Sequence, residues 1–379
     1  MADRQNGSRR KRMLLGLGSA FSIAAAAYSL YWFAYGQYFQ STDDAYVTGN
    51  LVQLMPQVAG NVESVFADET DRVQAGETLV ALDPTDARIA LSKAENDLAE
   101  TVRKVKQLYE VSSELGAEVK SRQAEYAKAK ADLERRKSLI AAHAVSKEEL
   151  QHAQDGFDAA KAALDAANHR HASSLAAVAN TTLTTHPAVL AAETRLKEAW
   201  LAWKRTTIAS PASGYVAKRS VQVGERIAPG NSLMVIVPLD RIWIDANFKE
   251  DQLSRIRIGQ PVKLTSDLYG KKTVFHGKVQ GIGAGTGSVF SLLPPQNATG
   301  NWIKVVQRLP VRIALDPKEI EAHPLRIGLS MIATVDAHDE RGPVLQSAPR
   351  ESAADSTAIY DGGQEEADRI ISRILRENG

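Results

Sequence analysis

The sequence predicts an elongated, multi-domain α+β protein in which a long antiparallel α-helical hairpin is inserted into a small, split β domain. Three observations lead to this fold class. A charge-free apolar stretch near the N-terminus is long enough to cross a membrane. Residues 84–204 are poor in glycine and carry a heptad repeat. Two short β-type segments flank that region and repeat one another, and further short strands after them predict a small β-barrel.

These features divide the 379 residues into seven segments. In chain order we expect a cytoplasmic basic N-terminus (1–12), a transmembrane anchor (13–36), a linker with the first barrel strand (37–50), a split β domain (51–83 with 205–238), the helical hairpin (84–204), a β-barrel domain (239–340) and a flexible tail with a short amphipathic helix (341–379). The chain runs out and back, so the barrel should lie near the membrane and the hairpin tip farthest from it.

Charge and composition exclude several classes of function. The whole chain has 46 Lys and Arg against 45 Asp and Glu, and residues 84–204 have 18 against 17. Such a balance offers no basic surface to a nucleic acid. The absence of cysteine excludes disulfides and thiolate chemistry. We find no nucleophilic triad or paired catalytic carboxylates, so we expect neither an enzyme nor a metal or cofactor site.

The apolar stretch covers residues 13–35, which are 23 residues without a charge. As a helix it would rise about 34 Å, enough to span the hydrocarbon core. Basic residues 9–12 precede it and Asp43 and Asp44 follow it, which predicts a cytoplasmic N-terminus. A cleaved signal peptide is the alternative, with small residues 25–27 as a cleavage site. The length of the apolar run favours an anchor, because signal cores have about 7–15 residues.

The split β domain carries an internal repeat. The two copies place glycine, apolar, glycine and apolar residues at matching positions, which are Gly60, Val73, Gly76 and Leu82 in the first and Gly214, Ile227, Gly230 and Ile236 in the second. We expect all four glycines at tight turns between strands.

The repeat resembles the biotinyl/lipoyl carrier fold, a barrel-sandwich hybrid, cut in two by the hairpin. A carrier would present a modifiable lysine where the halves join, yet residues 82–84 and 208–211 contain none. The resemblance therefore implies the fold without a swinging-arm function.

The hairpin has an apolar seam on each arm. The outgoing seam is Leu91, Leu98, Val105, Ser112, Val119, Tyr126, Leu133 and Ile140, with Ala94, Leu108, Leu115 and Ala129 beside it. The return seam is Leu150, Phe157, Leu164, His171 and Val178, with Ala153, Ala160 and Ala167 beside it. Spacings of seven predict a coiled coil.

The two arms reverse at residues 141–145, and Ser146 with Glu149 predicts a capping box for the second helix. Residues 181–187 interrupt the return arm with β-branched residues and a proline, as a hinge or as a bend.

Three residues at the reversal mark a candidate docking site. Arg135, Leu139 and Ser146 follow the Arg-x3-Leu-x6-Ser spacing, which resembles the hairpin tips of periplasmic adaptor proteins. The resemblance implies that these side chains dock onto an outer-membrane channel.

After the repeat, short apolar runs predict barrel strands at residues 242–246, 262–264, 274–279, 311–315 and 331–335, and a helical turn at 249–253. Residues 44–47, 246–250, 285–302 and 304–313 resemble the EmrA branch of HlyD-type membrane fusion proteins, a resemblance that extends over residues 34–337.

This resemblance implies a periplasmic adaptor of a tripartite efflux pump in the inner membrane of a Gram-negative bacterium. Its expected partners are an EmrB-like major facilitator drug:proton antiporter, a TolC-like outer-membrane channel and further copies of itself in a ring or tube. Two alternatives stay open, an adaptor of a type I protein-secretion ABC transporter and a coiled-coil scaffold without transport. In the tail, Ala367, Ile370, Ile371, Ile374 and Leu375 form an amphipathic helix that we expect on the barrel or at the membrane surface.

Overall fold

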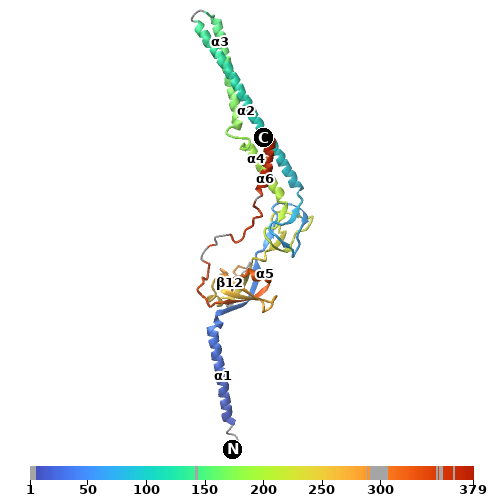
Figure 1. Cartoon of the computed structure of the whole chain (residues 1–379), viewed down its shortest axis with the longest axis vertical. Coiled ribbons are helices and arrows are strands. Elements are labelled where there is room, and N and C mark those ends of the chain that lie inside the picture. Colours follow the sequence, from blue (N-terminus) through green and yellow to red (C-terminus); the bar gives the residue numbers. More distant parts are fainter. Residues whose placement is uncertain are drawn as a thin grey trace, which may run out of the picture.

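The computed structural model confirms the elongated α+β architecture. It describes residues 6–140, 144–287, 289–290, 306–346, 349, 353–361 and 363–379, with the backbone alone for residues 6–12. The N-terminal helix, the β-barrel, the split β domain and the helical hairpin follow one another along the long axis (Figure 1). The hairpin and the N-terminal helix α1 lie at opposite ends of the described molecule.

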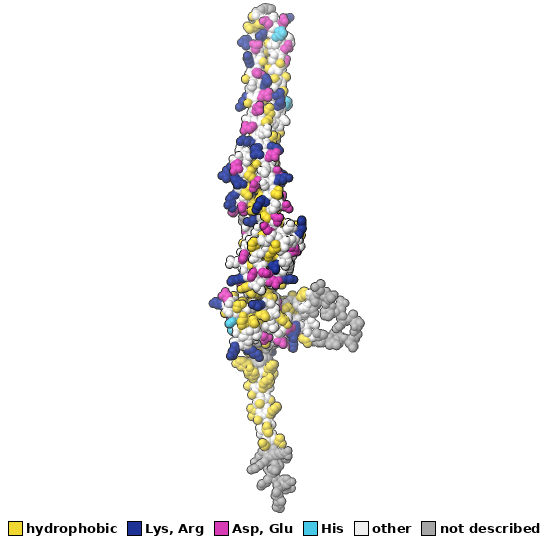
Figure 2. Space-filling view, turned by 90° about the vertical axis from the view of Figure 1, so that its right-hand side faces the viewer, with side chains coloured by type: hydrophobic (Ala, Val, Ile, Leu, Met, Phe, Trp, Pro, Cys, Tyr) yellow, Lys and Arg dark blue, Asp and Glu magenta, His cyan; other side chains and the backbone are white. Residues whose placement is uncertain are grey.

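The N-terminal helix α1 (Asn6–Ala34) leads through the short helix η1 (Gly36–Tyr38) into the barrel. Within the described residues, Met13–Tyr38 is the one helical stretch long and apolar enough to cross a membrane, and none of it is buried. Its surface is almost wholly apolar (Figure 2). The ring of Tyr38 stacks on His338 with 4.6 Å between ring centroids, which ties the end of the apolar stretch to the barrel.

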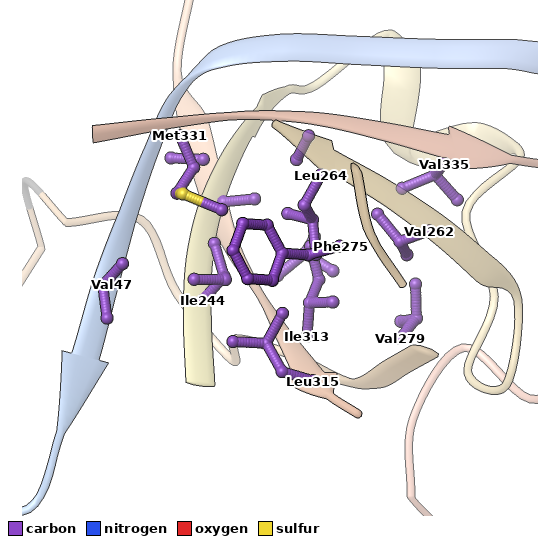
Figure 3. Packing of buried hydrophobic residues seen from close by; sticks show 14 of the residues in the cluster. Val47, Ile244, Val262, Leu264, Phe275, Val279, Ile313, Leu315, Met331 and Val335 are labelled. Atoms are coloured by element: carbon purple, nitrogen blue, oxygen red, sulfur yellow. The ribbon is translucent and has the colours of Figure 1, made fainter. Parts of the chain in front are cut away.

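Six strands close the barrel in the order β1-β10-β13-β12-β11-β14. They are β1 (Phe39–Gly49), β10 (Ile242–Lys249), β11 (Pro261–Ser266), β12 (Val274–Ile282), β13 (Arg308–Leu315) and β14 (Ser330–Asp336). Alternate residues point inward, where Phe275 fills the centre among aliphatic side chains (Figure 3). The expected helical turn is η2 (Gln252–Ser254), and a short helix α5 (Pro317–Ala322) follows β13.

The split β domain consists of two four-stranded sheets, β2-β9-β7-β4 and β6-β5-β3-β8, each with strands from both sides of the hairpin. The strands are β2 (Val52–Leu54), β3 (Gly60–Val65), β4 (Arg72–Val73), β5 (Thr78–Leu82), β6 (Thr207–Ala209), β7 (Gly214–Arg219), β8 (Arg226–Ile227) and β9 (Met234–Val237).

Strand pairing in this domain follows the sequence repeat. The first glycine of each copy pairs with the apolar residue of the other copy, so Gly60 pairs with Ile227 and Gly214 with Val73. Within each copy the strands pair at matching positions, Val62 with Leu82 and Val216 with Ile236. The two copies therefore form pseudo-symmetric halves that complete each other's sheets.

Two of the four glycines do not lie at turns, so that part of the prediction is wrong. Gly76 and Gly230 have φ of 86° and 97°, which a residue without Cβ adopts freely. Gly60 and Gly214 instead begin strands β3 and β7. A Cβ on Gly214 would come within 2.5 Å of the Val237 carbonyl oxygen, so this glycine permits close backbone approach.

The hairpin consists of an outgoing helix α2 (Thr85–Ile140) and a return arm of two helices, α3 (Lys147–Val178) and α4 (Pro187–Lys204). The seam positions are buried or half-buried except Leu108, which is 40% exposed. Leu108 lies beside Tyr109, whose hydroxyl group is 2.8 Å from that of Thr181 between α3 and α4. The predicted seam is wrong at Leu108, because the neighbouring Tyr109 instead packs against the core that α2 and α4 share.

The predicted interruption of the return arm is confirmed. Helix α3 ends at Val178, and Asn180 has a φ of 57°. Helix α4 starts with Pro187 in its first turn, and the His186 side chain accepts a hydrogen bond from the Ala188 amide at 3.2 Å. Proline has no backbone N–H, and its absence costs α4 no hydrogen bond because N–H groups in the first turn of a helix have no intrahelical acceptor.

The C-terminal helix α6 (Gln364–Asn378) packs against α2 and α4 at the base of the hairpin. Both locations predicted for it, on the barrel and at the membrane surface, are therefore wrong. The helix buries Ile371 and Ile374 in one apolar core with Val102 of α2 and Leu196 of α4, and Ala367 is buried as well. The apolar stripe of α6 packs against α2 and α4, and the sequence pattern does not identify these helices as its partners.

Candidate functional site at the hairpin tip

The three predicted docking residues lie at the far end of the hairpin, where α2 ends and α3 begins. The amide of Ala144 donates to the Leu139 carbonyl at 3.2 Å and so helps to close the reversal. Of the predicted reversal, residues 141–143 lie outside the described residues. Arg135 and Leu139 belong to the last turns of α2, and Ser146 immediately precedes α3.

Ser146 forms the predicted capping box. Its hydroxyl oxygen accepts from the Glu149 amide at 3.1 Å, and the Glu149 carboxylate accepts from the Ser146 amide at 2.7 Å and from its hydroxyl at 3.0 Å. These bonds satisfy N–H groups that the start of a helix leaves unpaired. The Ser146 hydroxyl is thus already used within the tip, and its contribution is to set the direction in which α3 starts.

Arg135 and Leu139 present different chemistry to solvent. The Arg135 side chain is exposed and contacts the Asp132 carboxylate at 3.0 Å. Leu139 is 39% exposed, whereas Leu133 of the seam is 2% exposed. One turn of α2 therefore offers a guanidinium group and an accessible leucine side by side, which suits a partner surface with an acidic group beside an apolar recess.

Two further residues shape the tip. Asp132 also accepts from Arg136 at 3.0 Å, and Arg136 reaches the Glu149 carbonyl at 3.4 Å, so this arginine joins the two arms. The sequence signal for them is the spacing of three and four residues between a carboxylate and the two guanidinium groups, which places all three on one helix face. That spacing is common on coiled coils, so it does not distinguish these residues from ordinary surface ion pairs.

The electrostatics of the tip follow from the cap. Hydrogen bonds from the Ser146 amide and hydroxyl hold the pKa of Glu149 below its usual value, and the nearby Arg136 charge acts in the same direction. Glu149 therefore remains ionised at neutral pH, where its negative charge also lies favourably at the N-terminus of α3.

A hollow lies between α2 and α3, near the end of α3. It is an open groove lined by Ser112, Gly116 and His171 among others. A Cβ on Gly116 would lie 3.2 Å from the His171 ring, so the lack of a side chain on Gly116 leaves the space that the ring enters. The described residues contain no cluster of three or more His, Asp or Glu side chains that could hold a metal ion. The groove thus follows from seam packing.

Comparisons with known proteins agree with this architecture. Residues 85–206 match the α-helical hairpin domain of EmrA, and residues 241–337 match the AAEA-like β-barrel domain. The probable multidrug resistance protein EmrK of Escherichia coli K12 is 47% identical over 100% of this chain and 98% of its own length. The multidrug export protein EmrA of the same organism is 47% identical over 93% of this chain and 91% of its length.

A relative with a different printed name is similar over nearly the whole chain. The fatty acid resistance protein FarA of Neisseria gonorrhoeae is 45% identical over 98% of this chain and 93% of its own. Matches of this identity and coverage include the hairpin tip, the split domain and the barrel together. The chain therefore belongs to the EmrA family of membrane fusion proteins, the periplasmic adaptors of multidrug efflux.

Proposed function

We propose that this chain joins an EmrB-like major facilitator drug:proton antiporter in the inner membrane to a TolC-like outer-membrane channel, for the efflux of drugs and other toxic compounds. The EmrA relative of Escherichia coli K12 is a multidrug export protein, and the membership of this chain in the same family supports the proposal. The observation that carries the proposal is the accessible Arg135 and Leu139 pair at the end of the molecule opposite the apolar helix α1.

The dimensions of the chain suit this task. Helix α2 has 56 residues and so rises about 84 Å. The barrel and the split domain add to this reach between α1 and the tip (Figure 1). One apolar helix within the described residues supports anchorage in the inner membrane by a single segment. The basic residues 9–12 favour a cytoplasmic N-terminus, which supports a periplasmic location for the barrel and the hairpin.

The proposed mechanism is assembly. Several copies would associate into a ring or tube through their split domains and hairpins. Substrate would cross the periplasm inside this tube. Arg135 and Leu139 would contact the channel directly, whereas Ser146 would hold α3 in the orientation that presents them. The energy of transport would come from the proton gradient used by the antiporter.

Co-expression tests the partners directly. The full chain, produced in a Gram-negative strain that lacks its own efflux adaptors, should co-purify in detergent with an EmrB-like antiporter and restore drug resistance when that antiporter is present. Resistance restored only with a protein-secretion ATPase would contradict the proposal and favour a secretion adaptor. Resistance unchanged by any transporter would contradict a role in transport and favour a scaffold.

A further inference from the structure

The C-terminal tail follows a path that touches every domain outside the membrane. It begins after β14 of the barrel, and its helix α6 lies beside the base of the hairpin (Figure 1). At the barrel, the Ile258 amide donates to the Pro343 carbonyl at 3.0 Å. At the split domain, the Thr357 hydroxyl donates to the Pro211 carbonyl at 2.8 Å.

Asp355 holds the tail at the junction of barrel and split domain. Two chain crossings join these domains, between β1 and β2 and between β9 and β10. Arg241 of the second crossing contacts the Asp355 carboxylate at 2.7 Å, and Asn50 of the first donates to it at 3.3 Å. One carboxylate therefore holds both crossings, so a change in the angle between the two domains would strain these bonds.

The apolar face of α6 completes the base of the hairpin. Its buried residues recur at spacings of three and four, which forms one stripe along the helix. The stripe packs into a single core with Leu98 and Val102 of α2 and with Val189 and Leu196 of α4. Without α6, part of this core would face water, because two helices cannot enclose it.

Polar contacts set the direction of α6 relative to α4. Asp368 contacts Lys197 at 2.7 Å, and Glu366 lies 4.0 Å from Lys204. The start of α6 thus lies beside the end of α4, and the two helices are antiparallel. At the other end, Asn378 accepts from Arg103 of α2 at 2.6 Å.

The end of α6 reaches the interruption between α3 and α4. A Cβ on Gly379 would lie 2.5 Å from the Leu183 side chain, which also packs against the core that α6 completes. Leu183 belongs to the eight-residue connection 179–186. The connection is therefore held by α6 on one side and by the Tyr109 contact with Thr181 on the other.

We propose that the C-terminal tail is an interdomain brace, in which α6 supports the return arm at the connection 179–186 and Asp355 fixes the barrel against the split domain. The brace makes the direction of the hairpin depend on the orientation of the barrel. All contacts of the brace lie within one chain, so the brace does not depend on the partners proposed above.

Two variants remove the brace at different points. The double substitution Ile371→Asp with Ile374→Asp places charges on the buried face of α6, and Ser372→Asp on its exposed face is the matched control. Asp355→Ala releases the junction and leaves α6 unchanged. All variants are made in the full chain in detergent micelles, so the anchor and all domains are present.

Hydrogen exchange measures the first half of the brace. In the double variant we expect amides of residues 179–190 to exchange at least tenfold faster, while those of β10 and β13 in the barrel remain protected. Ser372→Asp should leave both regions unchanged. If α6 exchanges rapidly in the double variant while residues 179–190 keep their protection, the proposed support of the connection is wrong.

Spin labels measure the second half. The chain contains no cysteine, so cysteines introduced at the exposed Leu268 of the barrel and Leu201 of α4 would be the only labelling sites. Asp355→Ala should broaden the distance distribution between these labels at least twofold. An unchanged width, with the tail released at Asp355, would overturn the proposed coupling between barrel and hairpin.

Discussion

The capping box at the tip allows the role of Ser146 to be tested separately from direct contact with a partner. Ser146→Ala removes the oxygen that accepts the Glu149 amide at 3.1 Å and the hydroxyl that donates to the Glu149 carboxylate at 3.0 Å. Loss of a serine cap costs about 1 kcal/mol, and about 1.4 kcal/mol corresponds to a factor of ten. We therefore expect the first turn of α3 to open about fivefold more often.

The assay is hydrogen exchange of residues 147–152, together with drug resistance in cells that carry the pump. Ser146→Thr keeps a hydroxyl cap, so it should retain slow exchange and resistance, whereas Ser146→Ala should lose part of both. The seam near Leu133 remains protected in either variant because it is buried independently of the cap. If Ser146→Thr loses resistance while exchange stays slow, Ser146 acts by direct contact and the capping account is wrong.

Three other predictions address the tip, the barrel and its acid sensitivity. Arg135→Asp should abolish resistance with normal expression and folding, because Arg135 is exposed; Lys128→Asp, also exposed on α2, should retain resistance. Phe275→Ala should lower the free energy of unfolding of the barrel by about 3–5 kcal/mol, measured by denaturant titration, because it empties the centre of the core. Partial burial raises the pKa of Asp336, but hydrogen bonds from His338 outweigh it and hold that pKa below its usual value. The resulting contribution to stability is present above the ordinary aspartate pKa of about 4 and is lost at lower pH, so in thermal melts Asp336→Asn should lose less stability than the wild type on acidification.

The outcomes that contradict these predictions differ. Full resistance in Arg135→Asp would exclude this side chain from docking. A loss of only a few tenths of a kcal/mol in Phe275→Ala would mean that the barrel repacks around the gap. Equal acid sensitivity of the wild type and Asp336→Asn would show that other carboxylates control the barrel at low pH.

Features that depend on local spacing could be predicted from the sequence. The spacing of Gly60 and Gly76 recurs at Gly214 and Gly230, and the strands pair according to that repeat. The heptad rows predicted the seam because residues seven apart share one face of a coiled coil. Ser146 and Glu149 predicted the cap because three residues is the spacing that lets each side chain reach the other's backbone amide.

Features that depend on distant contacts could not be predicted in the same way. The stripe of α6 shows that one face must be buried, yet it does not identify α2 and α4 as the covering helices. Gly60 and Gly214 have the same sequence context as turn glycines, and only the approach of other strands distinguishes them. Leu108 fits the heptad, but Tyr109 packs against the core of α2 and α4 in its place.

Cross-linking in cells tests most directly whether the hairpin tip docks onto an outer-membrane channel. Because the chain has no cysteine, Leu139→Cys gives a unique thiol at the tip for a photo-activated cross-linker in living cells, and Leu268→Cys on the barrel gives an exposed control. We predict that Leu139→Cys cross-links to a TolC-like channel and that Leu268→Cys does not. Cross-linking of Leu139→Cys only to inner-membrane proteins, in cells that retain resistance, would contradict the proposed direction and role of the hairpin.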